Sequence, residues 1–228
     1  MLRRTSADIP IVMISTPDPV EHELVTNLPR PEGNVTGVAQ SSPELISKRI
    51  EVLKELHPRL ARLAIIERSK IGPDDTYSDL LKANVNIAAR RFDFTWESFV
   101  ANAPEDFPKV FAQMVAGGFD SVYIPPGPVP FASQAIIREL ALKHGVATLG
   151  ELGFYARYGF LLTYGSDVTV NFRRGADFVD KLLRGAKPSE LPVEQPTKIR
   201  NGDKSQNREG IGPYRAADLL ARADEVIE

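Results

Sequence analysis

The sequence contains no cysteine among its 228 residues. This absence excludes disulfide bonds, catalysis by a thiol and zinc sites with cysteine ligands. Histidine is also scarce, because only His22, His57 and His144 occur, at or near the ends of the expected helices. No second metal ligand stands at a suitable spacing from any of them, so we predict solvated or capping histidines, and neither a metal site nor a cofactor.

Neither sign of charge predominates, since 28 lysine and arginine residues face 30 acidic ones, for a net charge of -2. A nucleic-acid partner is therefore not expected. No run of residues is long and apolar enough to span a membrane. The basic start Met1–Arg4 is not followed by the apolar core of a signal peptide, so the chain as written is expected to stay in the cytoplasm.

Motifs for common chemistry are missing as well. The chain has no dinucleotide-binding or phosphate-binding glycine loop and no nucleophile elbow. A small Rossmann-like enzyme would need a cofactor loop or a pair of nucleophile and base, and neither is found. We therefore expect no catalytic residues and no enzymatic activity.

Short apolar runs alternate with amphipathic helical segments along the chain, which predicts an α/β fold with a mostly parallel sheet. Strands are expected at residues 9–15, 35–38, 63–66, 91–95, 121–124, 146–149 and 160–164. Helices are expected at residues 20–28, 42–56, 77–89, 104–116, 131–144 and 168–183. Residues 198–215 are polar and unpatterned, which indicates a loop or disorder, and an amphipathic tail follows at 216–228.

Ligands of open α/β sheets bind at the carboxyl ends of the strands. Each of these ends carries hydroxyls, carboxylates, prolines or an aromatic ring. Any single loop of this kind is accounted for equally well by turn formation, but the whole set favours a ligand site. The candidate ligand-binding residues are Thr16, Asp18, Glu67, Arg68, Pro126, Tyr164, Ser166 and Asp167. Tyr164 is expected to stack on the solute, and Asp18 or Glu67 to bind an ammonium group.

Several segments in a fixed order resemble the substrate-binding proteins of ABC transporters, of the tryptophan/tyrosine-binding type. The segments are residues 9–12, 18–20, 28–37, 42–45, 48–56, 164–165, 179–188, 191–197 and 220–228. The resemblance implies a periplasmic-binding-protein fold of type I-like form, with two Rossmann-like lobes that close on a small amino-acid-like solute. It also implies an importer permease with a separate ATPase subunit as partners, and a periplasmic or extracellular location.

The same resemblance suggests domain boundaries. Residues 1–57 and 165–190 would form a partial lobe one, and residues 58–164 and 191–228 would form lobe two. Family members begin with about a hundred further residues, so we expect an N-terminally truncated, incomplete lobe one with an unpaired sheet edge. Self-association through that lobe and weak solute binding would follow.

Residues 198–218 depart from the family pattern, which has an apolar strand and helix there. Residues 198–212 can be encoded by a nucleotide sequence that, when it is read one base later, encodes an apolar segment similar to that of the family. We therefore hypothesise a frameshift at 198–218, with genuine divergence as the alternative. Two alternative functions also remain: the ligand-sensing module of a regulator, for which no helix-turn-helix is visible, and a non-functional remnant of a binding protein.

Overall fold

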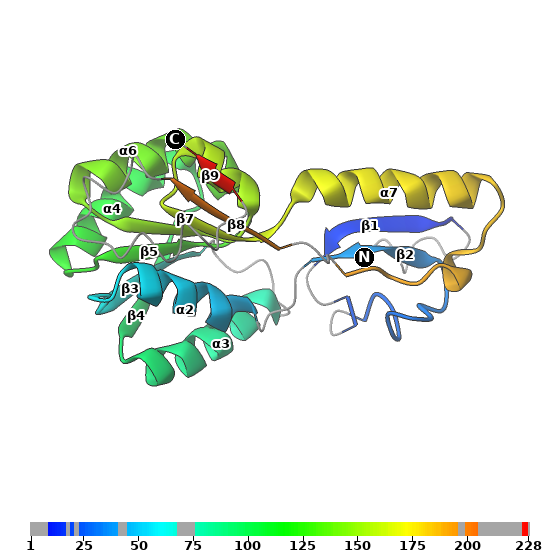
Figure 1. Cartoon of the computed structure of the whole chain (residues 1–228), viewed down its shortest axis with the longest axis horizontal. Helices are drawn as coiled ribbons and strands as arrows, with labels where there is room; N and C mark the ends of the chain where they lie inside the picture. Colours follow the sequence, from blue (N-terminus) through cyan, green and yellow to red (C-terminus); the bar gives the residue numbers. More distant parts are fainter. Residues whose placement is uncertain are drawn as a thin grey trace. The chain divides into compact units, whose positions relative to one another are not determined.

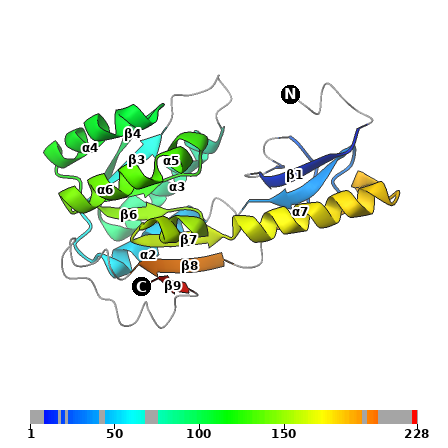
Figure 2. The same cartoon turned by 90° about the horizontal axis from the view of Figure 1, so that it is seen from above.

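The computed structural model describes residues 9–16, 19–20, 23–40, 45–67, 76–195, 199–204 and 225–227. The chain divides into two compact units. Unit 1 comprises Met1–Pro43 and Ser166–Ile199, and unit 2 comprises Glu44–Gly165 and Arg200–Glu228. Most of the longer elements of each unit are labelled in Figure 1, and Figure 2 shows the same cartoon from above.

Unit 1 is built on two parallel strands, β1 (Ile11–Thr16) and β2 (Val35–Ala39). Helix α7 (Val168–Leu183) packs against both strands, and a short 3₁₀ helix, η3 (Pro188–Glu190), follows it. A small apolar core lies between these elements, formed by Met13, Val25, Val35, Ala39 and Val193.

Gly37 explains how closely β1 and β2 approach each other. Its φ of +130° lies in a region that favours glycine, and a β-carbon there would collide with the carbonyl oxygen of Met13. On the other side of β2, the N–H of Glu194 donates to the carbonyl of Gly37 at 3.0 Å, and the N–H of Ala39 donates to the carbonyl of Glu194 at 2.8 Å. The chain around residue 194 therefore extends this small sheet.

Unit 2 contains a sheet in the order β4-β3-β5-β6-β7-β8-β9. Its strands are β3 (Arg62–Glu67), β4 (Thr95–Val100), β5 (Ser121–Ile124), β6 (Ala147–Gly150), β7 (Leu162–Ser166), β8 (Ile199–Lys204) and β9 (Glu225–Ile227). Every strand pair of this sheet whose register is described is parallel. The predicted α/β fold with mostly parallel sheets is confirmed.

Helices cover both faces of this sheet, which explains why its strands are continuous apolar runs. Leu63 and Ile65 of β3 belong to one core cluster, whereas Ala64 and Ile66 belong to the other. The first face packs against α2 (Leu45–Leu56) and α3 (Thr76–Phe92). The second packs against α4 (Phe107–Ala116) and α6 (Gln134–His144). Shorter elements complete the unit: η1 (Pro104–Asp106), α5 (Pro128–Ala132) and η2 (Gly153–Tyr158).

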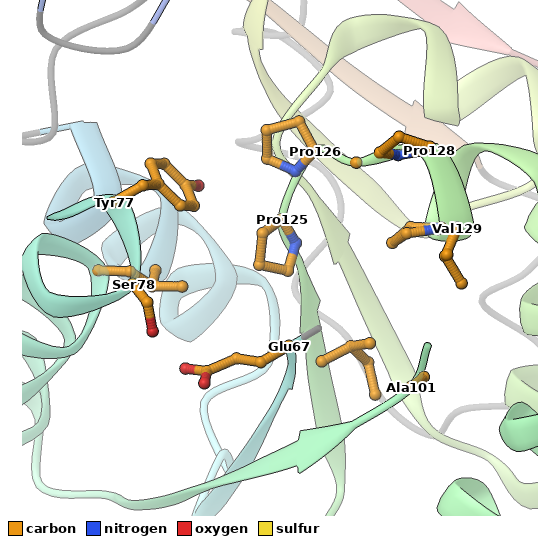
Figure 3. Close-up of a pocket in the computed structure, with 12 residues that line it drawn as sticks. Glu67, Tyr77, Ser78, Ala101, Pro125, Pro126, Pro128 and Val129 are labelled. Atoms are coloured by element: carbon orange, nitrogen blue, oxygen red, sulfur yellow. The ribbon is translucent and has the colours of Figure 1, made fainter. Parts of the chain in front are cut away.

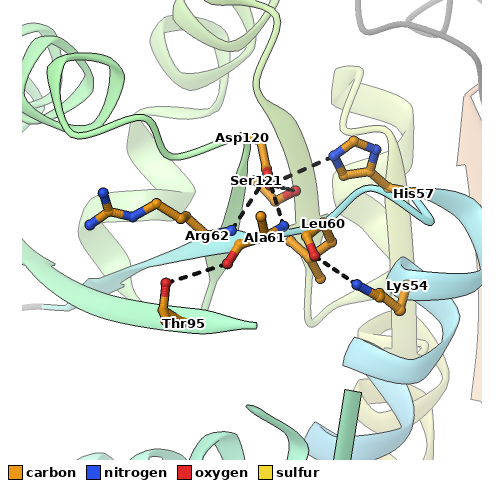
Figure 4. A network of polar contacts seen from close by, with 8 residues as sticks. All are labelled: Lys54, His57, Leu60, Ala61, Arg62, Thr95, Asp120 and Ser121. Atoms are coloured by element: carbon orange, nitrogen blue, oxygen red, sulfur yellow. Dashed lines mark hydrogen bonds and ion pairs between the residues drawn. The ribbon is translucent and has the colours of Figure 1, made fainter. Parts of the chain in front are cut away.

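A polar network ties together the amino ends of β3, β4 and β5 (Figure 4). Oδ2 of Asp120 accepts the N–H groups of Ala61 at 3.0 Å and Arg62 at 3.4 Å, and Oδ1 accepts the hydroxyl of Ser121 at 2.9 Å. Nε2 of His57 lies 3.6 Å from Oδ1. Burial alone would raise the pKa of Asp120, but these neighbours, His57 first, hold that pKa below its ordinary value.

Three sequence predictions of secondary structure were wrong. The strand expected at 91–95 lies at Thr95–Val100, because α3 continues through Arg90 and Arg91 to Phe92 and ends at Asp93, whose φ is +53°. No helix occurs among the described residues of 20–28, where turns and bends surround the buried Val25. Part of the loop expected at 198–215 is the strand Ile199–Lys204.

The remaining predicted elements agree with the structure to within a few residues, although the start expected at 42–44 for α2 lies outside the described residues. The frameshift hypothesis concerns residues 198–218, and most of these, residues 205–218, also lie outside the described part of the chain. The division into units differs from the predicted lobe boundaries in two places. It places α2 in unit 2, because Ile50 and Leu53 pack in the same core as β3. It places residues 191–199 in unit 1, where Glu194 pairs with β2. Within the described ranges, no helix has both the length and the apolar character needed to cross a membrane.

Candidate functional site

A pocket opens at the carboxyl ends of three neighbouring strands of unit 2, β3, β4 and β5. Its walls come from the end of β3, the residue after β4, the proline-rich segment after β5 and the first turns of α3 (Figure 3). The lining residues are Ile66, Glu67, Tyr77, Ser78, Leu81, Ala101, Pro125, Pro126, Gly127, Pro128, Val129 and Pro130. The pocket encloses a small cavity of about 70 Å³ that opens to solvent.

The chemistry of this pocket is mostly apolar. Figure 3 shows Tyr77 and Ser78 on one side and Pro125, Pro126 and Val129 on the other. Prolines supply rigid apolar surface, since their ring fixes the backbone, so this wall is preformed. Such a lining suits the apolar part of a small solute.

Glu67 is the one carboxylate among the described residues that line the pocket, and it already has protein partners. The hydroxyl of Ser98 donates to its Oε1 at 2.9 Å, and Nζ of Lys82 lies 3.1 Å from its Oε2. The negative charge of Glu67 is therefore offset within the protein. A solute ammonium at this position would have to compete with Lys82.

The pocket residue Tyr77 contacts a buried charged pair, Arg49 and Glu151, whose side chains are 1% and 3% exposed. Nη2 of Arg49 lies 3.4 Å from Oε1 of Glu151, and Nε of Arg49 donates to the carbonyl of Tyr164 at 2.7 Å. The hydroxyls of Tyr77 and Tyr123 both donate to Oε2 of Glu151, each at 2.7 Å. These contacts compensate charges that would be costly to bury alone.

The net effect of burial and neighbouring charges is to shift the pKa values of Arg49, Tyr77 and Tyr123 upward. Burial, together with the charge of Glu151, raises the pKa of Tyr77 and of Tyr123 well above the ordinary value. Burial alone would lower the pKa of Arg49, but the nearby charge of Glu151 holds that pKa above its ordinary value. Both tyrosines therefore remain hydroxyl donors and Arg49 remains a cation at any ordinary pH.

The eight residues singled out from the sequence are distributed over both units. Glu67 and Pro126 come together in the pocket of unit 2. Tyr164, also in unit 2, does not line that pocket; its ring is half-buried against the core shared by β3 and α3. Asp18 and Arg68 lie outside the described residues.

The other three candidates, Thr16, Ser166 and Asp167, belong to unit 1. Ser166 is 1% exposed, and its hydroxyl has no hydrogen-bond partner within the described chain. The carboxylate of Asp167 caps α7 by accepting the N–H of Thr169 at 2.9 Å.

Sequence reasoning missed Tyr77, Val129 and the Arg49–Glu151 pair. One signal for the pair was available. Arg49 occupies a core position in the helical series Ile46, Ile50, Leu53, and a cation at such a position requires a buried partner. No group of three or more histidine, aspartate or glutamate side chains within the described residues could hold a metal ion.

The α/β architecture agrees with the comparison to known proteins. The model of the ABC transporter substrate binding protein family matches residues 1–207 of the 228. The chain belongs to this family. Among curated proteins, it is 25% identical over 191 residues to a tyrosine-binding protein of Clostridioides difficile (strain R20291). That match covers 82% of this chain and 52% of the relative, so the chain spans about half the length of the relative.

Solved structures confirm the fold. A domain from Streptococcus pneumonia in complex with L-Trp superposes with a TM-score of 0.84 at 21% identity, covering 99% of this chain and 74% of the other. A conserved domain protein from Vibrio cholerae gives a TM-score of 0.86 at 22% identity, with the same coverage. A ligand-free, open substrate-binding protein with adhesive properties from Clostridium difficile gives 0.69 at 18% identity, covering 100% and 74%.

Proposed function

We propose that this protein is the solute-binding component of an ABC importer and that it binds an amino-acid-like solute, with the aromatic amino acids as first candidates. Family membership supports the class of function. The names of two relatives, one a tyrosine-binding protein and one solved with L-Trp, support the class of solute. We also propose that the protein acts outside the cytoplasm. There it would deliver its solute to a permease whose ATPase is a separate chain.

The observation that carries the proposal is the pocket at the carboxyl ends of β3, β4 and β5. Its apolar walls suit an aliphatic or aromatic side chain of the solute, and its position follows the general rule for ligands of open α/β sheets. Glu67 is engaged by Lys82 and Ser98, so we assign the pocket to the apolar part of the solute.

The contacts to the charged groups of the solute are a second part of the proposal. We assign them to Thr16, Asp18, Arg68, Ser166 and Asp167. The stacking expected of Tyr164 is assigned to Tyr77, because Tyr164 packs against the core and Tyr77 lines the pocket. This part rests on the strand-end rule and on the family resemblance. It includes closure of two lobes around the solute, a movement that a ligand stabilises by contacting both.

A matched pair of valine substitutions tests the pocket assignment. Val129 lines the pocket, whereas Val115 is a partly exposed residue of α4 outside its lining. Val129→Phe should fill the pocket and weaken binding of L-tryptophan and L-tyrosine by at least about tenfold in calorimetric titration, and Val115→Phe should leave it unchanged. Equal affinities for the two variants would refute the assignment, and absence of binding by the unsubstituted protein would refute the aromatic amino acids as its solutes.

A further inference from the structure

Tyr77 belongs both to the pocket lining and to the buried charged cluster. Its ring faces the proline wall of the pocket (Figure 3). Its hydroxyl donates to Oε2 of Glu151 at 2.7 Å, and Glu151 follows directly after β6. One side chain therefore connects the wall of the pocket to a carboxylate held in the interior.

Glu151 is itself fixed from several directions. Arg49 of α2 lies beside its Oε1, and Tyr123 of β5 donates to its Oε2. Charge-assisted hydrogen bonds of this kind are stronger than neutral ones, and burial strengthens them further. An anchor of this rigidity restricts the position of any side chain attached to it.

The position of Tyr77 in the chain makes such an anchor useful. Tyr77 lies in the first turn of α3, where the backbone N–H groups have no partners within the helix. A helix terminus is the part of a helix most prone to fraying. Without the bond to Glu151, the ring of Tyr77 and the first turns of α3 would be free to leave the pocket wall.

We propose that Glu151, held by Arg49, is a positioning residue that fixes Tyr77 as one wall of the solute pocket. This inference rests on the proposed function, since it assigns a role in solute binding to a group that does not touch the solute. The cluster sets the width of the pocket before the solute arrives, which reduces the ordering cost of binding. A purely structural cluster would contribute to stability alone.

Tyr123 provides a closely matched control. Its hydroxyl donates to the same oxygen of Glu151 at the same distance, 2.7 Å, but Tyr123 is fully buried and does not line the pocket. Tyr77→Phe and Tyr123→Phe each remove one hydroxyl and keep the aromatic ring of the side chain. Both variants therefore lose one hydrogen bond to Glu151, but only in Tyr77→Phe did that bond hold a residue of the pocket wall.

Two measurements on both variants test the proposal. In calorimetric titration with L-tryptophan and L-tyrosine, Tyr77→Phe should weaken binding about fivefold, and Tyr123→Phe less than about twofold, even if their unfolding temperatures fall equally. In hydrogen exchange without any solute, the amides of Leu80–Asn84 in α3 should exchange about fivefold faster in Tyr77→Phe than in Tyr123→Phe.

The two measurements separate failure of this inference from failure of the proposed function. If the unsubstituted protein binds neither amino acid, the proposed solute is wrong, and the exchange experiment still decides whether Tyr77 is held by Glu151. If the two variants show the same exchange rates in α3, or the same affinities where binding is measurable, Glu151 does not position Tyr77 and the inference is overturned.

Discussion

The carbonyl oxygen of Glu151 occupies the space that a side chain at Gly165 would require. Gly165 lies near the end of β7, next to the boundary between the two units, and Nη2 of Arg49 lies 3.7 Å from the place of its missing β-carbon. The backbone of β7 can therefore approach the segment after β6 only with glycine at this position.

Gly165→Ala should consequently destabilise the protein by about 1–3 kcal/mol, because the new methyl group forces β7 away from Glu151. Denaturant unfolding measures the change. Gly127→Ala is the control, since its β-carbon would meet no atom closer than 3.5 Å, at Cδ of Pro130. If both variants unfold at the same denaturant concentration as the original protein, the close approach at Gly165 is not a constraint.

Arg49→Leu should be among the most destabilising single substitutions in unit 2. It leaves the carboxylate of Glu151 buried without its cation, and loss of one partner of a buried pair costs about 3–5 kcal/mol. The neighbouring Lys48 offers a control, because its ion pair with Glu51 is partly exposed and should contribute less than about 1 kcal/mol. Equal unfolding free energies for Arg49→Leu and Lys48→Leu would show that the buried pair is no more important to stability than a surface pair.

The network around Asp120 predicts a specific dependence of stability on pH. The pKa of Asp120 is lower in the folded protein than in the unfolded chain, so its carboxylate stabilises the fold at pH values above the unfolded value, about 4. This contribution is lost as the pH falls through the lower folded pKa. Asp120→Asn should thus cost about 1 kcal/mol at pH 7 and progressively less below pH 4.

Urea unfolding of both proteins between pH 7 and pH 3 measures this difference. Asp180→Asn serves as the control, because Asp180 is largely exposed and pairs with Arg184 on the surface of α7. A stability difference between Asp120→Asn and the original protein that stays constant across this range would show that the carboxylate does not provide the pH dependence.

Much of the fold could be predicted from the sequence because the parallel sheet of unit 2 is buried on both faces. Strands such as Ser121–Ile124 are short, mostly apolar runs between turns, which is the pattern that a strand covered on both faces requires. The edge strand β4 has no such signature. Its residues alternate in exposure. The last turn of the preceding helix, Arg90–Phe92, is equally compatible with a strand, so the strand was predicted at 91–95, before its actual position at Thr95–Val100.

The candidate site was predictable only in part. The strand-end rule pointed to Glu67 and Pro126, which do line the pocket, because that rule depends on topology alone. It could not reveal that Lys82 and Ser98 engage Glu67, or that Tyr77 shares Oε2 of Glu151 with Tyr123. Those contacts join residues far apart in the sequence and depend on the side-chain directions of packed helices and strands, and no local pattern encodes them.

A crystal structure of the protein grown with L-tryptophan or L-tyrosine would show directly whether the pocket of unit 2 holds the solute. We expect solute density at the carboxyl ends of β3, β4 and β5, with the aromatic side chain between Tyr77 and the prolines at 125 and 126. Density in the polar hollow beside Arg62, Glu97 and Phe119, or at any other place away from Glu67 and Pro126, would refute this assignment.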